Sequence, residues 1–390
     1  MLNSEAGHSI RKLRIALRFS LVDAISPWLV LLLYLTDIDL VWVVNVNFVL
    51  LTAYLAVNYR VGTPSKFINY IFFGAILLSL IKIISSIYFK QDLQLNHAFS
   101  YLYGLFMPMV ALSFAKIVSG VDYDKIHEEI CSYALKYFYI AVPTIIVYAL
   151  LYFSGQVSYF GLGVNLHYIY PFFLTGKMLP VAVFLLLIVF SGKRSVLMNY
   201  LLQTMAFYGG SMKDRFFSSM LLFIALLFTI FILVTYTSLL DRFSWIFTGD
   251  FDWTDPYFLL VAAGGRFEEV FGIQNYFRAH PLDVFFGSAP GAYYIWAVDL
   301  SDYSATKNYS HVTIFGFIFR YGLVFAIPLY GFFIWRILKD LGSRNPFYIV
   351  FVGVFTSSLF GANLVIDPTS WIFIGLFLSL RDGKQRIKML

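Results

Sequence analysis

Three side chains in the second half of the chain are suited to chemistry on an anionic substrate: Arg266, Arg278 and His311. Arginine stays charged, and its planar fork of donors binds a phosphate or carboxylate through two hydrogen bonds at once. Histidine has an ordinary pKa of about 6.5, so it can act as a general base near neutral pH. These three residues are therefore the first candidates for a functional site.

Each candidate also has a structural interpretation. Arg266 could anchor an interfacial helix to lipid phosphate, and His311 could be a helix-start histidine that bonds to the preceding loop. Arg278 could pair with a nearby carboxylate, for which the sequence offers Glu268, Glu269 and Asp283. His280 precedes a proline and is expected to be a turn residue.

The segment around these candidates, residues 236–308, is far longer than a connection between two helices requires. Long ordered loops tend to be functional. Residues 264–278 begin with two glycines and place apolar side chains at 267, 270, 271 and 277, which predicts an amphipathic helix on a membrane surface. A glycine and proline turn at 286–294 could expose backbone N–H groups.

The composition indicates an integral membrane protein. Of the 390 residues, 60% are hydrophobic and 13% are charged, whereas a soluble domain is roughly 25% charged. Continuous apolar runs near the ~20 residues of a membrane helix favour an all-α, polytopic transmembrane helical bundle over a barrel. The predicted spans outside the middle of the chain are 15–35, 38–58, 67–89, 98–118, 134–153, 216–237, 309–336, 347–363 and 369–380.

The middle of the chain allows two interpretations. A single span at about 170–190, followed by an interfacial helix at 195–208, gives ten spans. Three short spans, roughly 165–177, 179–191 and 195–208, give twelve. Arg194 is a cytoplasmic anchor in the first interpretation and faces an outer cavity in the second. Both divide the chain into N-terminal helices (1–235), a large outer loop (236–308) and C-terminal helices (309–390).

The charges set the expected orientation. Basic residues cluster before the first span and after the last, which places both termini in the cytoplasm by the positive-inside rule. Acidic residues outnumber basic ones in 236–308, as expected of an external loop. The net charge of +6 therefore reflects membrane borders and predicts no nucleic-acid partner. Arg320 lies about three turns into a predicted span, so it should face the protein interior with a partner; Lys82 also lies within a span.

The order of these features resembles the bacterial O-antigen polymerase and O-antigen ligase superfamily. The matching motifs, best over 180–325, are Ser191-Gly192-Lys193-Arg194-Ser195, Gly265-Arg266, His280-Pro281-Leu282 with Gly287 to Gly291, and His311 with Gly322. Many members carry an acidic residue just before the helix glycine, where this chain has Arg320.

The resemblance implies a glycosyltransferase of the bacterial inner membrane with its active site facing the periplasm. It implies a polysaccharide polymerase that transfers a growing undecaprenyl-pyrophosphate-linked glycan onto a lipid-linked repeat unit. In this interpretation Arg266 and His311 are catalytic, and Arg278, Arg194 and Arg320 bind the pyrophosphate or substrate. Membrane lipids and a chain-length regulator are the other expected partners.

Two alternatives remain: a ligase that moves the glycan to lipid A core, and a transporter of lipid-linked oligosaccharides. The chain shows no internal repeat of the kind common in transporters. No cofactor and no metal are expected. An Asp-x-Asp motif at Asp250 and Asp252 could bind a divalent cation, but two-residue matches of this kind arise often by chance.

Overall fold

The computed structural model describes residues 2–25, 42–59, 65–88, 95–119, 123–154, 266–290, 292–297, 304–307, 313–340, 346–359 and 368–379, together with residues 28, 29, 32, 33, 36, 180, 183 and 203. This part of the chain is mostly helical. Two of its helices are long and apolar enough to cross a membrane, Lys66–Tyr88 and the Phe99–Val118 portion of its successor.

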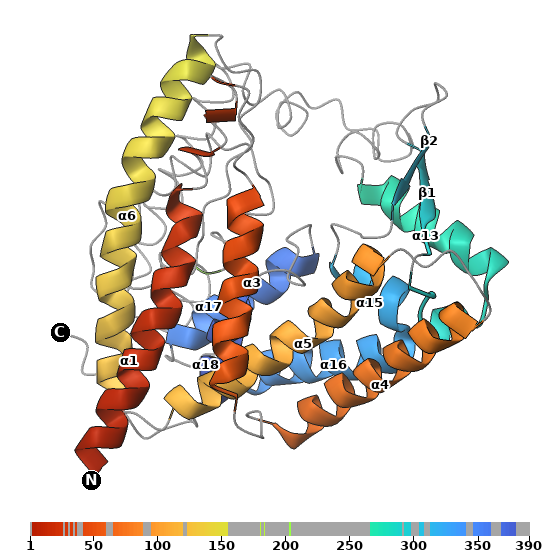
Figure 1. The fold of residues 1–390 in the computed structure, drawn as a ribbon, viewed down its shortest axis with the longest axis horizontal. Coiled ribbons are helices and arrows are strands. Elements are labelled where there is room, and N and C mark those ends of the chain that lie inside the picture. Colours follow the sequence, from red (N-terminus) through yellow and green to blue (C-terminus); the bar gives the residue numbers. More distant parts are fainter. Residues whose placement is uncertain are drawn as a thin grey trace.

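The described residues of the N-terminal half form five long helices and a short 3₁₀ turn. These are α1 (Leu2–Ser20), η1 (Leu21–Ile25), α3 (Trp42–Val57), α4 (Lys66–Tyr88), α5 (Leu95–Val118) and α6 (Tyr123–Phe153). Figure 1 shows α1, α3 and α6 standing side by side, while α5 runs obliquely next to them and α4 lies along α5. Hydrogen bonds from Arg14 to Glu129 and from Arg18 to Tyr133 join α1 to α6.

The C-terminal part supplies the other elements of the described residues. They are α13 (Arg266–Ala279), α14 (Asp283–Phe286), β1 (Tyr294–Ala297), β2 (Ser304–Lys307), α15 (Thr313–Tyr321), α16 (Leu323–Lys339), α17 (Pro346–Leu359) and α18 (Pro368–Ser379). Helix α16 packs along α4, and α18 packs along α5. Helix α13 and the hairpin lie together at one end of the molecule (Figure 1).

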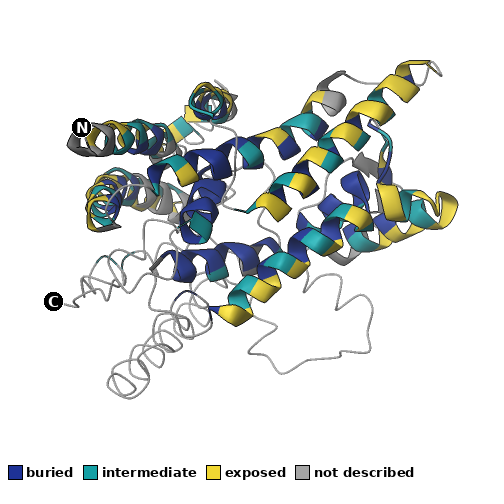
Figure 2. Cartoon of the chain, turned by 90° about the horizontal axis from the view of Figure 1, so that it is seen from below, coloured by how far each residue is buried: buried dark blue, intermediate teal, exposed yellow. Residues whose placement is uncertain are grey.

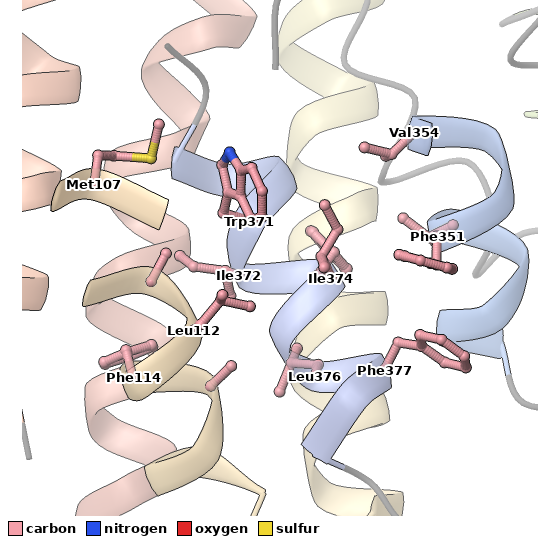
Figure 3. Packing of buried hydrophobic residues seen from close by; sticks show 14 of the residues in the cluster. Met107, Leu112, Phe114, Phe351, Val354, Trp371, Ile372, Ile374, Leu376 and Phe377 are labelled. Carbon is pink, nitrogen blue, oxygen red and sulfur yellow. The ribbon is translucent and has the colours of Figure 1, made fainter. Parts of the chain in front are cut away.

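The core lies where α5, α17 and α18 meet. Figure 3 shows Leu112 and Phe114 of α5 beside Ile372 and Leu376 of α18, with Phe351 of α17 on the other side. Small residues allow this approach: a Cβ on Gly375 would lie 2.5 Å from the Cβ of Ala115. Close contact through small residues is typical of helices that associate in a membrane.

Helix α4 has a different surface. Its inner side buries Ile68, Phe72 and Ala75, but large apolar side chains such as Phe73 and Ile84 are exposed on the outside. Figure 2 shows this alternation along the helix. A helix that is apolar on all sides and leaves one side uncovered has the pattern expected where lipid or another protein covers it.

Several predicted spans coincide with helices of the structure. Helices α3, α4, α5, α17 and α18 begin within a few residues of the predicted positions, and α6 begins earlier, at Tyr123. The helix predicted within 264–278 is also present as α13, which begins at Arg266. The predicted spans in the middle of the chain, apart from residues 180, 183 and 203, and the span at 216–237 lie outside the described residues.

Three expectations need correction. The first helix begins at Leu2, not at residue 15, and passes into a 3₁₀ turn at Leu21. The predicted span 309–336 is divided at Gly322 into α15 and α16. The φ of Gly322 is +80°, a backbone conformation that glycine adopts readily and that strains other residues. The chain is not purely helical, because β1 and β2 pair antiparallel with Tyr294 opposite Lys307; four-residue strands are too short for periodicity to reveal.

Candidate functional site

An open groove lies between α13 and α15. Its volume is about 570 Å³. Most of its lining is apolar, and Gln274 and Arg278 supply the polar groups. The lining residues are Val270, Ile273, Gln274, Phe277, Arg278, Val284, Phe315 and Ile318. A groove of this character suits a ligand that is mostly hydrocarbon and carries an anionic group.

The positively charged side chain at the groove, Arg278, comes from helix α13. Arg278 lies in its last turn, is exposed, and donates a hydrogen bond from Nη1 to Oδ1 of Asn275 at 3.4 Å. A cation in the last turn is favoured by the helix dipole. Asp283, one of the carboxylates proposed to pair with Arg278, instead accepts a 2.7 Å hydrogen bond from the hydroxyl of Tyr276.

Tyr276 organises the end of α13. Its ring stacks on His280 with centroids 4.4 Å apart, and its backbone oxygen accepts a 3.1 Å hydrogen bond from Nδ1 of that histidine. Burial, followed by the hydrogen bond to Asp283, raises the pKa of Tyr276 above its ordinary value. The turn role expected for His280 is confirmed, because its carbonyl accepts the N–H of Asp283.

The turn after α14 is held by helix α4. The ammonium of Lys82 donates to the carbonyl oxygens of Phe286 and Gly287, each at 2.5 Å, and to that of Ser288 at 3.1 Å. Gly287 has a φ of +83°, and a Cβ there would lie 2.6 Å from the backbone nitrogen of Tyr321. Because Gly287 has no side chain, the backbone of this turn can pack closely against the end of α15.

The proposed role of this turn as a donor of N–H groups is wrong for Gly287 and Ser288. The N–H of Gly287 donates to the carbonyl of Asp283, and that of Ser288 donates to the carbonyl of Phe319, both at 2.7 Å. The physical reason is that buried backbone donors must be paired, and here α14 and α15 supply the acceptors.

Arg320 lies on another side of α15, away from the groove lining. It is 9% exposed, and its guanidinium carbon lies 5.2 Å from the centre of the Tyr101 ring. The hydroxyl of Tyr101 shares a 2.5 Å hydrogen bond with that of Ser288, and Tyr321 donates to the backbone oxygen of Tyr101 at 2.8 Å. The expectation that Arg320 faces the interior with a partner is confirmed.

The structure thus places two of the five predicted site residues by their side chains. Arg278 borders the groove, and Arg320 is buried beside Tyr101. Arg266 opens α13, but its side chain, like Arg194 and His311 as a whole, lies outside the described residues. The described part of the chain contains no cluster of three metal-ligating side chains.

Sequence reasoning did not single out the residues that join the loop to the helices. Lys82 is a charge within a predicted span, and such a charge indicates a partner elsewhere in the chain. Nothing in the pattern identified Tyr101, Tyr276 or Ser288, because tyrosine and serine are common and their partners are distant in sequence.

No protein-family model, no curated protein and no solved structure matches the chain.

Proposed function

We propose that the chain is a polytopic membrane glycosyltransferase, namely a polysaccharide polymerase of the bacterial inner membrane. It would transfer a growing undecaprenyl-pyrophosphate-linked glycan onto a lipid-linked repeat unit. The observation that carries the proposal is the groove between α13 and α15, which combines an apolar lining with the cation of Arg278. The ordered motifs at 191–195, 265–266, 280–291 and 311–322 support the same activity.

The groove fits the chemical character of the donor. A polyprenyl diphosphate is a long hydrocarbon that ends in two phosphates. Phe277, Phe315 and Ile318 offer apolar surface for an isoprenoid segment. The guanidinium of Arg278 can bind the diphosphate through two parallel hydrogen bonds.

The chemistry then requires few groups. A sugar hydroxyl of the acceptor attacks the anomeric carbon of the donor, a new C–O bond forms, and the anomeric C–O bond to the diphosphate breaks. Negative charge grows on the leaving diphosphate, where a fixed cation such as Arg278 stabilises the transition state. The acceptor proton passes to a general base. The motif resemblance assigns that role to His311 and further phosphate contacts to Arg266 and Arg194. It also assigns a phosphate contact to Arg320, but Arg320 is buried beside Tyr101 and away from the groove lining, so the proposal does not include it.

The proposal includes ten to twelve spans, cytoplasmic termini and a periplasmic loop over 236–308. The positions of basic residues support this orientation. Lys82 and Tyr101 contact the turn at 286–288, so the C-terminal end of α4 and the N-terminal end of α5 adjoin the loop. Lys66 and Lys116 lie at the opposite ends of these two helices. The side away from the loop is therefore the basic one, as expected of the cytoplasmic face.

The test is a reconstitution. The purified protein in liposomes is given a lipid-linked repeat unit, and the products are separated by size. A polymerase gives a ladder of lengths, and Arg278→Ala should reduce its formation about 100-fold, because removal of one transition-state donor costs about this much. Arg11→Ala is the matched control, since Arg11 is an exposed arginine on α1.

Two outcomes contradict the proposal. If the wild-type protein forms no ladder but transfers a finished glycan to lipid A core, the enzyme is a ligase. If it forms neither product but moves the lipid-linked unit across the bilayer, it is a transporter. A ladder that survives Arg278→Ala unchanged removes Arg278 from the site.

A further inference from the structure

The contact between Lys82 and the turn at 286–288 joins helix α4 to the segment that connects the two walls of the groove. The ammonium of Lys82 has three donors, and three carbonyl oxygens of this turn accept from it. A lysine whose three donors are all used within the protein has none left for a substrate phosphate. Its role must therefore be exerted through the turn.

The turn lies alongside the apolar helices. Lys82 precedes the end of α4 at Tyr88 by six residues, which is about 9 Å at 1.5 Å per residue. Backbone carbonyls at this level need donors, because lipid supplies none. Lys82 meets this need for Phe286, Gly287 and Ser288, and Tyr101 bonds the Ser288 hydroxyl from α5.

The same turn connects to both walls of the groove. On one side it continues from α14, where Val284 lines the groove and Asp283 accepts the hydroxyl of Tyr276 on α13. On the other side the N–H of Ser288 donates to the carbonyl of Phe319 in α15, the helix that contributes Phe315 and Ile318 to the lining. The carboxylate of Asp283 also interacts electrostatically with Lys82.

We infer that Lys82 is the positioning residue of this site: it fixes the turn at 286–288 to α4 and thereby sets the distance between the α13 and α15 walls of the groove. This inference rests on the proposed function for its substrate, a polyprenyl diphosphate. Lys82 does not contact that substrate. Tyr101 supports the same turn from α5.

The test compares Lys82→Met, which keeps the length of the side chain and removes its donors, with Lys82→Arg, which keeps the charge. Lys66→Met is the matched control, because Lys66 is exposed at the other end of the same helix. The first measurement is hydrogen exchange of residues 280–290 in detergent. We expect exchange at least tenfold faster in Lys82→Met, a smaller change in Lys82→Arg and none in Lys66→Met.

The second measurement is the binding of farnesyl diphosphate, a short polyprenyl diphosphate, by the same variants. We expect Lys82→Met to raise the Kd about tenfold in the folded fraction, with Lys82→Arg restoring most of the affinity. In the polymerisation assay, the KM for the lipid-linked donor should rise more than kcat falls. A merely structural lysine would lower the amount of folded protein and leave both the Kd and the KM unchanged.

Unchanged exchange in Lys82→Met overturns the anchoring role, and faster exchange with an unchanged Kd overturns the positioning role. If Lys82→Met does not fold, Tyr101→Phe provides the second variant. It removes only the hydroxyl, which contacts Ser288 and the carbonyl of Ala289, and should shift both measurements in the same direction by less. Failure of the wild-type protein to form polymer would sink the polymerase proposal, whereas exchange and farnesyl diphosphate binding would still decide the role of Lys82.

Discussion

Gly287 and Gly322 meet backbone to backbone: a Cβ added to Gly322 would lie 2.5 Å from the amide nitrogen of Gly287. Both residues have positive φ, +83° and +80°. One ends the short helix of the loop and the other divides α15 from α16. The contact therefore ties the loop turn to the break in a helix that the sequence predicts as continuous.

Gly322→Ala should destabilise the protein by about 2 kcal/mol or more, because a side chain here meets both an unfavourable φ and the backbone of the loop turn. Gly287→Ala should have a similar effect. Thermal unfolding in detergent measures the change. Gly331→Ala is the matched control on α16, where an added Cβ meets nothing within 4 Å, and it should be neutral or slightly stabilising.

The helices were predictable because their signal is local. Apolar runs fix α4 and α5 within a few residues, since length and composition alone decide whether a helix can span a bilayer. The break at Gly322 was not predictable from hydropathy, because both halves are apolar and the reason for the break is a contact with residues 285–287. The four-residue strands of the hairpin were missed for a related reason: their pairing joins segments that carry no periodic pattern of their own.

The bond between Tyr276 and Asp283 should stabilise the end of α13 against local opening. Tyr276→Phe removes the donor and Asp283→Ala removes the acceptor of this part-buried, charge-assisted hydrogen bond. A double-mutant cycle should give a coupling free energy of about 1–2 kcal/mol. Hydrogen exchange over residues 276–287 provides the measurement. Additive effects of the two substitutions would mean that the bond does not form in solution.

The same tyrosine predicts a dependence on alkaline pH. The pKa of Tyr276 is raised by burial and then by its hydrogen bond to Asp283. A raised pKa means that the neutral phenol is favoured in the folded state. Its contribution to stability is complete below the unfolded pKa of about 10 and is lost as the pH rises above that value. Hydrogen exchange of the loop should accelerate above about pH 10 more in the wild-type protein than in Tyr276→Phe. Equal acceleration in both would contradict the assignment.

The site was predictable only in part, because some of its residues are far apart in the sequence. Arg278 was predictable as a candidate because an arginine in a helix of a long loop is suited to phosphate, and it does border the groove. The residues that set the groove, Lys82 and Tyr101, come from helices about two hundred positions earlier. A charge within an apolar span signals that a partner exists, but a single sequence does not say which segment supplies it.

The packing of α5 on α18 gives a prediction about the core. Gly375→Leu should separate the two helices, because even a Cβ at this position would lie 2.5 Å from the Cβ of Ala115 and 3.2 Å from the backbone of Leu112. Overpacking of this kind costs about 1–3 kcal/mol, seen as a lower melting temperature. Gly74→Ala should cost less, since its added Cβ meets only the end of the Phe325 ring, at 3.1 Å.

A labelling experiment tests the proposed orientation of the helices in the membrane. It compares a position in the loop with a position at the opposite end of α5. Asn275 is exposed on α13 in the loop, and Lys116 is exposed in the last turn of α5, at the end away from the loop contact of Tyr101. Single cysteines at these positions, in a Cys131→Ser background, should react differently with a membrane-impermeant maleimide. In bacterial spheroplasts Asn275→Cys should be labelled at once, and Lys116→Cys only after the membrane is lysed. The reverse pattern would place the groove in the cytosol, where no finished lipid-linked glycan is presented, and labelling of both positions before lysis would mean that α5 does not cross the membrane.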